Sequence, residues 1–197
     1  LEEVIAPKLT GSQTDYFAQF IQHYGYTDLA LIHPDGTVFY TVAHAADYGS
    51  NLFSGPYQET ELAQGVRKAL TSKALTFSDV QPYAAAHGKP MAFMAQPVLN
   101  GDVVELVVAV QIPIDVINTV MQQRAGLGTT AETYLVGSDL RMRSDSYLDP
   151  ARYSVRASFT APNTGTVDTS ASRAALAGIT DKQRMTNYLG QAVLSAY

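Results

Sequence analysis

The chain of 197 residues contains no cysteine and no tryptophan. Without cysteine, disulfides, thiolate metal sites and cysteine nucleophiles are excluded. Basic residues are also few, 13 Lys and Arg against 18 Asp and Glu, and they form no run. This balance argues against nucleic acid or an anionic membrane surface as the partner. The most apolar stretch, residues 103–114, is short and interrupted by Glu105, Gln111 and Pro113, so it predicts a buried strand.

Catalytic motifs are absent as well. The sequence has no GxSxG elbow, no HExxH, no P-loop and no GxGxxG after a strand. Its four histidines, at positions 23, 33, 44 and 87, lack the spacing of metal ligands. We therefore predict that the chain is not an enzyme and that it carries no metal and no cofactor.

Apolar residues make up 46% of the chain and charged residues 16%, which is typical of a soluble globular protein of one domain or two small ones. Residues 28–41 predict a β-hairpin around the turn Pro34-Asp35-Gly36. Other periodic stretches predict helices at 12–25, 60–70 and 114–123, and strands at 75–83, 91–98 and 103–112. Short turns between the strands favour antiparallel pairing, so the predicted class is α+β, with helices packed against the sheet.

A pattern in the first hairpin returns later in the chain. Residues 135–144 have the layout of residues 31–40, and residues 190–196 have that of residues 88–94, at offsets of 104 and 102 positions. Two anchors at nearly one offset favour a tandem repeat over a chance resemblance. We predict a helical segment at 1–25, a first module at 26–123 and a second at 124–197. The second module lacks a counterpart of 103–112, so we expect its sheet to be incomplete.

The loop after the first hairpin is rich in aromatic and acidic residues, and such a loop is a common place for a small-molecule site. Asp47, Tyr48 and Tyr57 are candidate ligand contacts. Their alternative role is structural, because Asp caps backbone amides in loops and Tyr covers the edge of a core.

Asp79 is expected in the middle of the strand at 75–83, on the same face as Tyr83. A carboxylate there needs a partner, which is either a ligand or one of the cations Arg67 and Lys89. Together with Asp47 and the tyrosines, Asp79 could form an acidic aromatic box for an ammonium group.

Three strand residues complete the candidate site: Tyr40, Phe93 and Gln111. Each could line the same cavity or belong to the core. In the second module, Arg141, Arg143 and Asp145 are interpreted as a solvated or internally paired strand and not as a second site.

Five segments in this order resemble a known family: residues 28–42, 47–57, 77–98, 107–115 and 126–146. They are similar to double Cache (tandem PDC) sensor domains, the extracytoplasmic ligand-sensing regions of bacterial methyl-accepting chemotaxis proteins and related sensor kinases. The resemblance implies two tandem PAS-like modules with the ligand in the membrane-distal one. The amino-acid-binding motif of the family includes an Arg and a Trp, and this chain has no Trp.

The resemblance implies a periplasmic sensor of an inner-membrane chemoreceptor that binds an amino acid, an amine or a small organic acid. The membrane would be reached through segments outside this chain, and a homodimer is expected in the full receptor. The alternatives are the sensor region of a histidine kinase or diguanylate cyclase, a cytosolic PAS-type cofactor domain, and a hydrolase built on a similar sheet.

Overall fold

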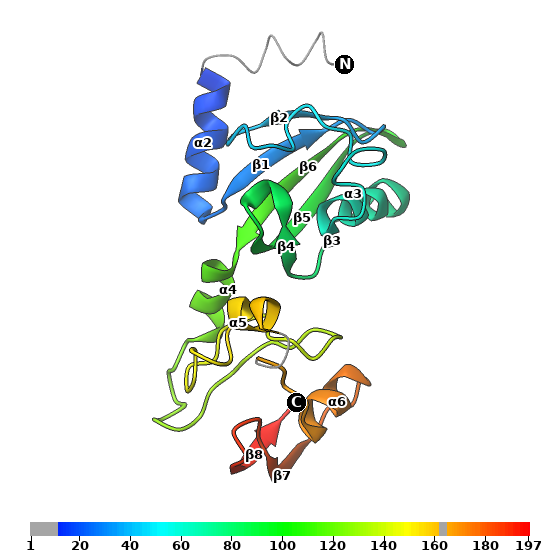
Figure 1. Cartoon of the computed structure of the whole chain (residues 1–197). Helices are drawn as coiled ribbons and strands as arrows, with labels where there is room; N and C mark the ends of the chain where they lie inside the picture. Colours follow the sequence, from blue (N-terminus) through cyan, green and yellow to red (C-terminus); the bar gives the residue numbers. More distant parts are fainter. Residues whose placement is uncertain (1–11, 162–164) are drawn as a thin grey trace. The chain divides into compact units, whose positions relative to one another are not determined.

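The computed structural model describes residues 12–161 and 165–197, and the first part of the helical segment predicted at 1–25 lies outside them (Figure 1). The chain forms two compact units, residues 1–116 and 117–197. Each unit is described separately below. Within the described residues, none of the helices is both long and apolar enough to cross a lipid bilayer.

The first unit is built on a six-stranded antiparallel sheet in the order β2-β1-β6-β5-β3, with β4 also paired to β5. Its elements are α2 (Ser12–Tyr24), β1 (Asp28–Ile32), β2 (Val38–Thr41), α3 (Glu61–Ser72), β3 (Thr76–Phe77), β4 (Gln81–Tyr83), the 3-10 turn η2 (Ala84–Ala86), β5 (Lys89–Asn100) and β6 (Val103–Pro113). The predicted α+β class is confirmed. The apolar strand β6 lies between β1 and β5, inside the sheet, as its composition predicted.

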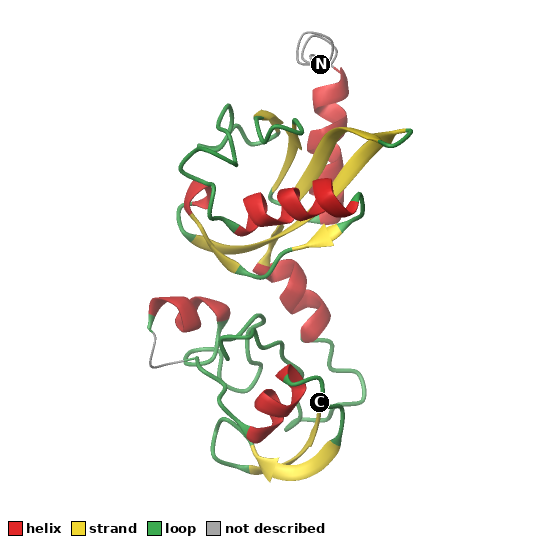
Figure 2. Ribbon diagram, turned by 90° about the vertical axis from the view of Figure 1, so that its right-hand side faces the viewer, coloured by secondary structure: helices red, strands yellow, loops and turns green. Residues whose placement is uncertain are grey.

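The two faces of this sheet are covered by different helices (Figures 1 and 2). Helix α3 begins at its cap Thr60, whose side chain accepts a hydrogen bond from the Ala63 amide. It buries Leu62, Ala63 and Val66 against one face, together with Tyr83 and Phe93. Helix α2 packs its own aromatic side chains on the other face. A site can therefore lie between α3 and the face of the sheet that α3 covers.

A β-bulge at Phe39 places the residues of β2 that follow it on the opposite faces of the sheet from those that simple alternation predicts. Val38 pairs with Ile32, but Tyr40 pairs with Leu31 and Thr41 with Ala30, which leaves Phe39 as the extra residue. Tyr40 consequently packs with Leu31 on the α2 face, and its ring lies 5.7 Å from that of Phe17. The prediction that Tyr40 shares a cavity with Phe93 is wrong, because simple alternation does not cross a bulge.

The single strand predicted at 75–83 is also wrong. Two short strands, β3 and β4, flank residues 78–80. The Asp79 carboxylate accepts a hydrogen bond from the next amide, that of Val80, at 2.7 Å. This local bond draws the backbone away from a regular ladder, and Pro82 has no amide hydrogen with which to continue it.

The second unit contains α5 (Val155–Thr160), α6 (Ser170–Leu176) and a hairpin of β7 (Lys182–Thr186) and β8 (Ala192–Ala196). Helix α4 (Ile114–Met121) contains the boundary between the units. In the described part of this unit the sheet has two strands. That is fewer than the six strands of the sheet in the first unit.

The predicted repeat of the hairpin turn is visible in its hydrogen bonds. The His33 amide donates to the Thr37 carbonyl at 2.9 Å, and Gly137 donates to Arg141 at the same distance. The third turn residue is left-handed in both copies, with φ of 93° at Gly36 and 63° at Leu140. Residues 104 positions apart thus adopt one turn, although their side chains differ.

Replacing Gly36 by alanine should lower the free energy of unfolding by roughly 2–4 kcal/mol, because a left-handed residue disfavours a side chain and the added methyl overpacks the Phe53 ring. An ideal Cβ at Gly36 would lie 2.6 Å from that ring. Gly101→Ala is the matched control, since Gly101 has φ of 59° and open space around it. Urea denaturation measures both variants. Equal losses for the two would contradict the role assigned to the Phe53 contact.

Candidate functional site

A small cavity lies on the α3 side of the sheet, beneath the loop from 42 to 60, here called the covering loop. It leaves about 10 Å³ for the centre of a water molecule, roughly the room that one water needs. Its walls come from β1, β5, β6, α3 and the covering loop, and the lining residues are Asp28, Ala30, Asp47, Leu62, Phe93, Ala109, Val110 and Gln111. The cavity combines apolar walls with three polar side chains, those of Asp28, Asp47 and Gln111.

The register of the sheet explains why these residues meet. Asp28 of β1 pairs with Gln111 of β6, which pairs in turn with Phe93 of β5. Two pairs further along, and so on the same face of the sheet, Ala30 lies opposite Ala109. The short side chains of Ala30 and Ala109 leave space over this face of the sheet, and the polar side chains of Asp28 and Gln111 lie at one end of that space.

Two buried polar atoms without partners, Asp47 Oδ1 and Gln111 Nε2, belong to residues that line this cavity. A third, Thr41 Oγ1, belongs to the residue that pairs with the lining residue Ala30. The three residues are only 5%, 8% and 0% exposed. A fourth such atom, His33 Nδ1, lies 3.2 Å from Asp35 Oδ1 and pairs with it when protonated. Unpaired buried groups are rare because they forfeit their hydration, so a cluster of them is typical of a binding site.

Asp28 is held by the backbone at the edge of this cluster. Its Oδ1 accepts hydrogen bonds from the amides of Ala43 at 2.9 Å and Leu29 at 2.8 Å. Burial raises the pKa of the Asp28 carboxyl, these backbone bonds oppose that effect, and the negative charge of Asp47 adds to it. A nearby cation would stabilise the ionised form of this carboxyl.

Asp47 ties the covering loop to the sheet. The Tyr83 hydroxyl donates to Asp47 Oδ2 at 2.6 Å, while Ser50 donates its hydroxyl to the Asp47 carbonyl at 2.7 Å and fixes the turn. Burial raises the pKa of Tyr83, and the bond to Asp47 raises it further. The Tyr83 ring packs edge-on against Phe93 at 4.8 Å and lies 5.9 Å from Tyr57. The polar contact is thus enclosed by aromatic rings.

The structure brings five of the eight predicted site residues together: Asp47, Tyr57, Tyr83, Phe93 and Gln111. Tyr40 lies on the opposite face of the sheet, as described above. Tyr48 is 49% exposed and packs against His44, so the expectation that it faces the pocket is not supported. Asp79 is exposed between β3 and β4 and does not line the cavity. Its expected role depended on the mid-strand position, which is wrong.

Sequence reasoning missed Asp28 and Thr41. Asp28 opens the apolar strand β1, and alternation with Ala30 and Ile32 would have placed it on the α3 face. A charged residue at the first position of a fully buried strand was therefore a usable signal. Thr41 gave no such signal, because the bulge at Phe39 decides its side.

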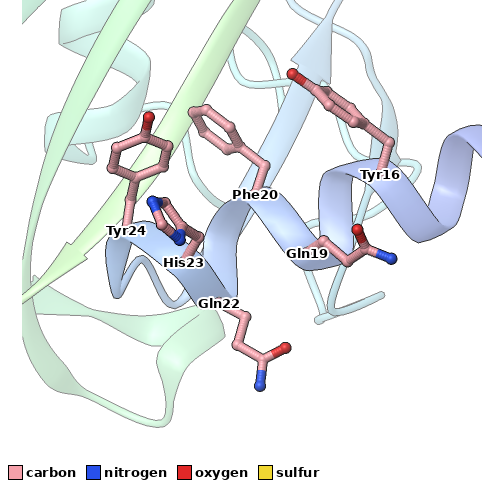
Figure 3. A pocket seen from close by; sticks show the side chains of 6 residues that line it. All are labelled: Tyr16, Gln19, Phe20, Gln22, His23 and Tyr24. Carbon is pink, nitrogen blue, oxygen red and sulfur yellow. The ribbon is translucent and has the colours of Figure 1, made fainter.

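A larger hollow is lined by side chains of α2, which Figure 3 shows. It measures about 520 Å³, and its lining residues are Tyr16, Gln19, Phe20, Gln22, His23 and Tyr24. Those of its lining residues that the structure describes all come from α2. None of the unpartnered buried atoms lies there. We therefore place the candidate site at the smaller cavity.

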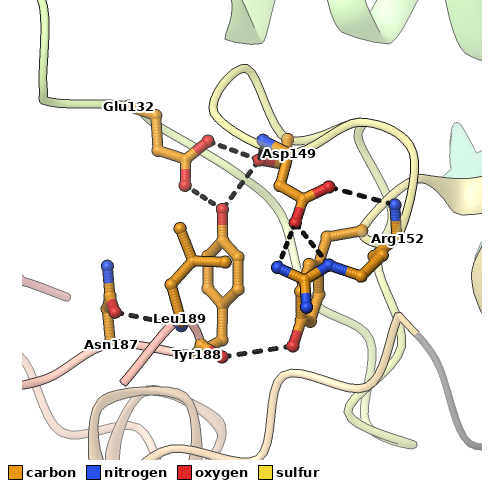
Figure 4. A network of polar contacts seen from close by, with 8 residues as sticks. Glu132, Asp149, Arg152, Asn187, Tyr188 and Leu189 are labelled. Atoms are coloured by element: carbon orange, nitrogen blue, oxygen red, sulfur yellow. Dashed lines mark hydrogen bonds and ion pairs between the residues drawn. The ribbon is translucent and has the colours of Figure 1, made fainter. Parts of the chain in front are cut away.

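The second unit also contains a polar cluster, but its members pair with one another (Figure 4). Glu132 accepts hydrogen bonds from the hydroxyls of Ser146 and Tyr188 and from the amides of Tyr147 and Leu148. The Tyr153 hydroxyl donates to the Tyr188 carbonyl at 3.1 Å. Within residues 117–161 and 165–197, no buried side-chain atom is left unpartnered. This network serves as internal structure.

The charged residues predicted near 141–145 are likewise paired internally. Arg143 is buried and lies 3.0 Å from Asp139, which is also 3.9 Å from Arg141. Asp145 accepts hydrogen bonds from the Asn118 side chain at 2.9 Å and the Val155 amide at 2.8 Å. Among the residues that the structure describes, no three His, Asp or Glu side chains gather as metal ligands.

Replacing Asp28 by asparagine should raise the free energy of unfolding at pH 7 by about 1 kcal/mol, because a desolvated charge is removed while the Oδ1 acceptor is kept. A carboxyl whose pKa is raised by folding stabilises the fold below its unfolded pKa, near 3.8, and loses that contribution as the pH rises through the raised value. The advantage of the variant should therefore vanish at pH 3.

Denaturant unfolding at pH 7 and pH 3 measures this difference. Asp102→Asn, in the exposed turn between β5 and β6, is the charge-matched control and should change little. An Asp28→Asn variant that is less stable than the parent at pH 7 would refute the assigned effect of burial.

No protein-family model matches the chain, and no curated protein sequence matches it. Solved structures do resemble it. The ligand-binding domain of the Pseudomonas fluorescens chemoreceptor CtaA with L-serine has a TM-score of 0.51 and 14% identity, covering 76% of this chain and 60% of that one. The ligand-binding domain of the Pseudomonas aeruginosa PAO1 amino acid chemoreceptor PctB with L-Gln has a TM-score of 0.51 and 14% sequence identity. The match covers 96% of this chain and 65% of that one.

A third similar structure is the extracellular domain of the putative histidine kinase mmHK1S-Z2, with a TM-score of 0.54 and 13% identity, covering 93% of this chain and 74% of that one. The chain spans less than two thirds of the length of both chemoreceptor domains. At these identities the likeness establishes the fold. It is the fold of extracellular ligand-binding sensor domains of chemoreceptors and histidine kinases.

Proposed function

We propose that the chain is the extracytoplasmic, small-molecule-sensing region of a membrane-bound chemoreceptor and that the ligand binds in the cavity of the first unit. The observation that carries this proposal is the pair of unpartnered atoms on Asp47 and Gln111, which line the cavity together with the buried Asp28. Hydrogen bonds from a ligand to these atoms would replace those that the atoms lost to water on burial. The aromatic rings of Tyr57, Tyr83 and Phe93 would pack on its apolar part.

Access to the site requires the covering loop to move. The cavity has room for about one water, whereas pockets for small molecules usually measure about 300–1,000 Å³. Breaking the bond between Tyr83 and Asp47 releases the loop from the sheet, and a ligand then replaces that bond with its own contacts. Ligand binding would thereby shift the population between an open and a closed covering loop, and the receptor would read this shift as its signal.

The second unit is proposed to be a tandem PAS-like module that does not bind the ligand. Its turn repeats that of the first unit bond for bond. In its described residues, 117–161 and 165–197, the buried polar side chains are satisfied internally, unlike Asp47 and Gln111 in the first unit. The full receptor is proposed to be a homodimer.

A sensor region of a histidine kinase is the second candidate, favoured by the similarity to mmHK1S-Z2. The site in the first unit is the same in both proposals. The receptors differ in the output domain that ligand binding controls, so the domain encoded downstream in the complete gene separates the two.

A thermal-shift screen over amino acids, amines and organic acids should identify a stabilising compound, since a ligand at 100 times its Kd stabilises the folded state by roughly 2.7 kcal/mol. For that compound, Asp47→Asn should weaken binding at least tenfold, about 1.4 kcal/mol. Asp102→Asn is the charge-matched control and should bind normally.

Hydrogen exchange locates the binding site independently of any substitution. The compound should slow exchange in the covering loop and β1, with little change in residues 117–197. Protection confined to the second unit, or normal binding by Asp47→Asn, would overturn the proposed site.

A further inference from the structure

We infer that the cavity of the first unit selects a small primary amine that bears a neutral oxygen acceptor, such as an amino alcohol, and discriminates against amino acids. This inference rests on the proposed function and specifies the ligand class of that same site.

Two buried carboxylates face this cavity. Asp28 and Asp47 both line it, and they are only 6% and 5% exposed. Of the residues described as lining it, none is Lys, Arg or His. The described lining thus has two acid groups and no cationic group that would neutralise the carboxylate of an amino acid.

The cations nearest in sequence to the covering loop are engaged elsewhere. The Arg67 guanidinium donates to the carbonyls of Gln58 at 2.8 Å and Leu52 at 3.4 Å, and it lies 4.9 Å from the centre of the Phe53 ring. His44 packs against Tyr48, with ring centres 5.0 Å apart. Neither side chain lines the cavity. The carboxylate of an amino acid would therefore enter as a third negative charge beside two others, in a site of low dielectric.

The unpartnered atoms define the complementary ligand. An ammonium group has three N–H donors, and Asp47 Oδ1 is an unpartnered acceptor on a residue that lines the cavity, where the Asp28 carboxylate supplies a second negative charge. Gln111 Nε2 is a donor and needs an acceptor, which a hydroxyl or ether oxygen of the ligand provides without adding charge. The alanine floor formed by Ala30 and Ala109 suits a short carbon chain.

Isothermal titration calorimetry with matched pairs tests the inference. Ethanolamine and L-serine differ by one carboxylate, and so do isoamylamine and L-leucine. Each amine should bind at least tenfold more tightly than its amino acid. Ethylamine lacks the oxygen and should bind about tenfold more weakly than ethanolamine, because Gln111 Nε2 then remains unpaired.

Two substitutions assign these preferences to the named groups. Asp28→Asn keeps the acceptor for the Leu29 and Ala43 amides, so it should fold and yet lose at least tenfold in ethanolamine affinity. Gln111→Leu should abolish the preference for ethanolamine over ethylamine. A circular dichroism melt checks that each variant is folded, and Asp47→Asn replaces Asp28→Asn if the latter does not fold.

The outcomes separate this inference from the proposed function. Amino acids that bind as tightly as the matched amines would overturn the inference, whereas the sensing function would stand. Binding of organic acids with no binding of amines would also overturn the inference and leave the sensing function in place. Failure of every compound in the thermal-shift screen would overturn the proposed function as well.

Discussion

The hydrogen bond between the Tyr83 hydroxyl and the Asp47 carboxylate is the contact on which the candidate site depends. It joins the covering loop to the end of β4, and the residues are both buried, at 2% and 5% exposure. A charge-assisted bond in such surroundings is strong, yet it satisfies only one oxygen of Asp47. The same carboxylate therefore closes the loop and keeps one acceptor available. Any ligand that competes for Asp47 also acts on the position of the loop.

The two units use one turn for different purposes. In the first, the turn at Gly36 is followed by a loop that encloses unpaired polar atoms. In the second, the buried polar groups around Glu132 find partners within the unit, from Ser146 to Tyr188. A satisfied network stabilises its fold, whereas unpaired groups reduce stability and become favourable only when a ligand pairs with them. This contrast is why the first unit is the proposed sensor.

Much of the fold could be predicted from the sequence, and less of the site. Turn chemistry at Pro34 to Gly36, the cap and apolar stripe of α3, and the apolar run of β6 act locally, so their elements appear where the pattern placed them. Asp47, Tyr83, Phe93 and Gln111 were also found, because aromatic and polar residues in a loop or on a buried strand are conspicuous. Three residues were placed wrongly from the sequence. A bulge turns Tyr40 to the other face of the sheet, and Tyr48 lies in an exposed turn of its loop. The position of Asp79 is set by its hydrogen bond to the Val80 amide.

The sequence by itself determined the α+β class, the antiparallel hairpins and the absence of thiol chemistry, because these follow from periodicity, turn residues and composition. Tertiary structure alone decided that Asp28 pairs with Gln111, that Thr41 pairs with the lining residue Ala30, and that the described lining of the cavity contains no Lys, Arg or His. These features depend on the register between strands that are distant in the chain. Whether a buried polar atom finds a partner is likewise a property of the packed structure, because the partner comes from another element.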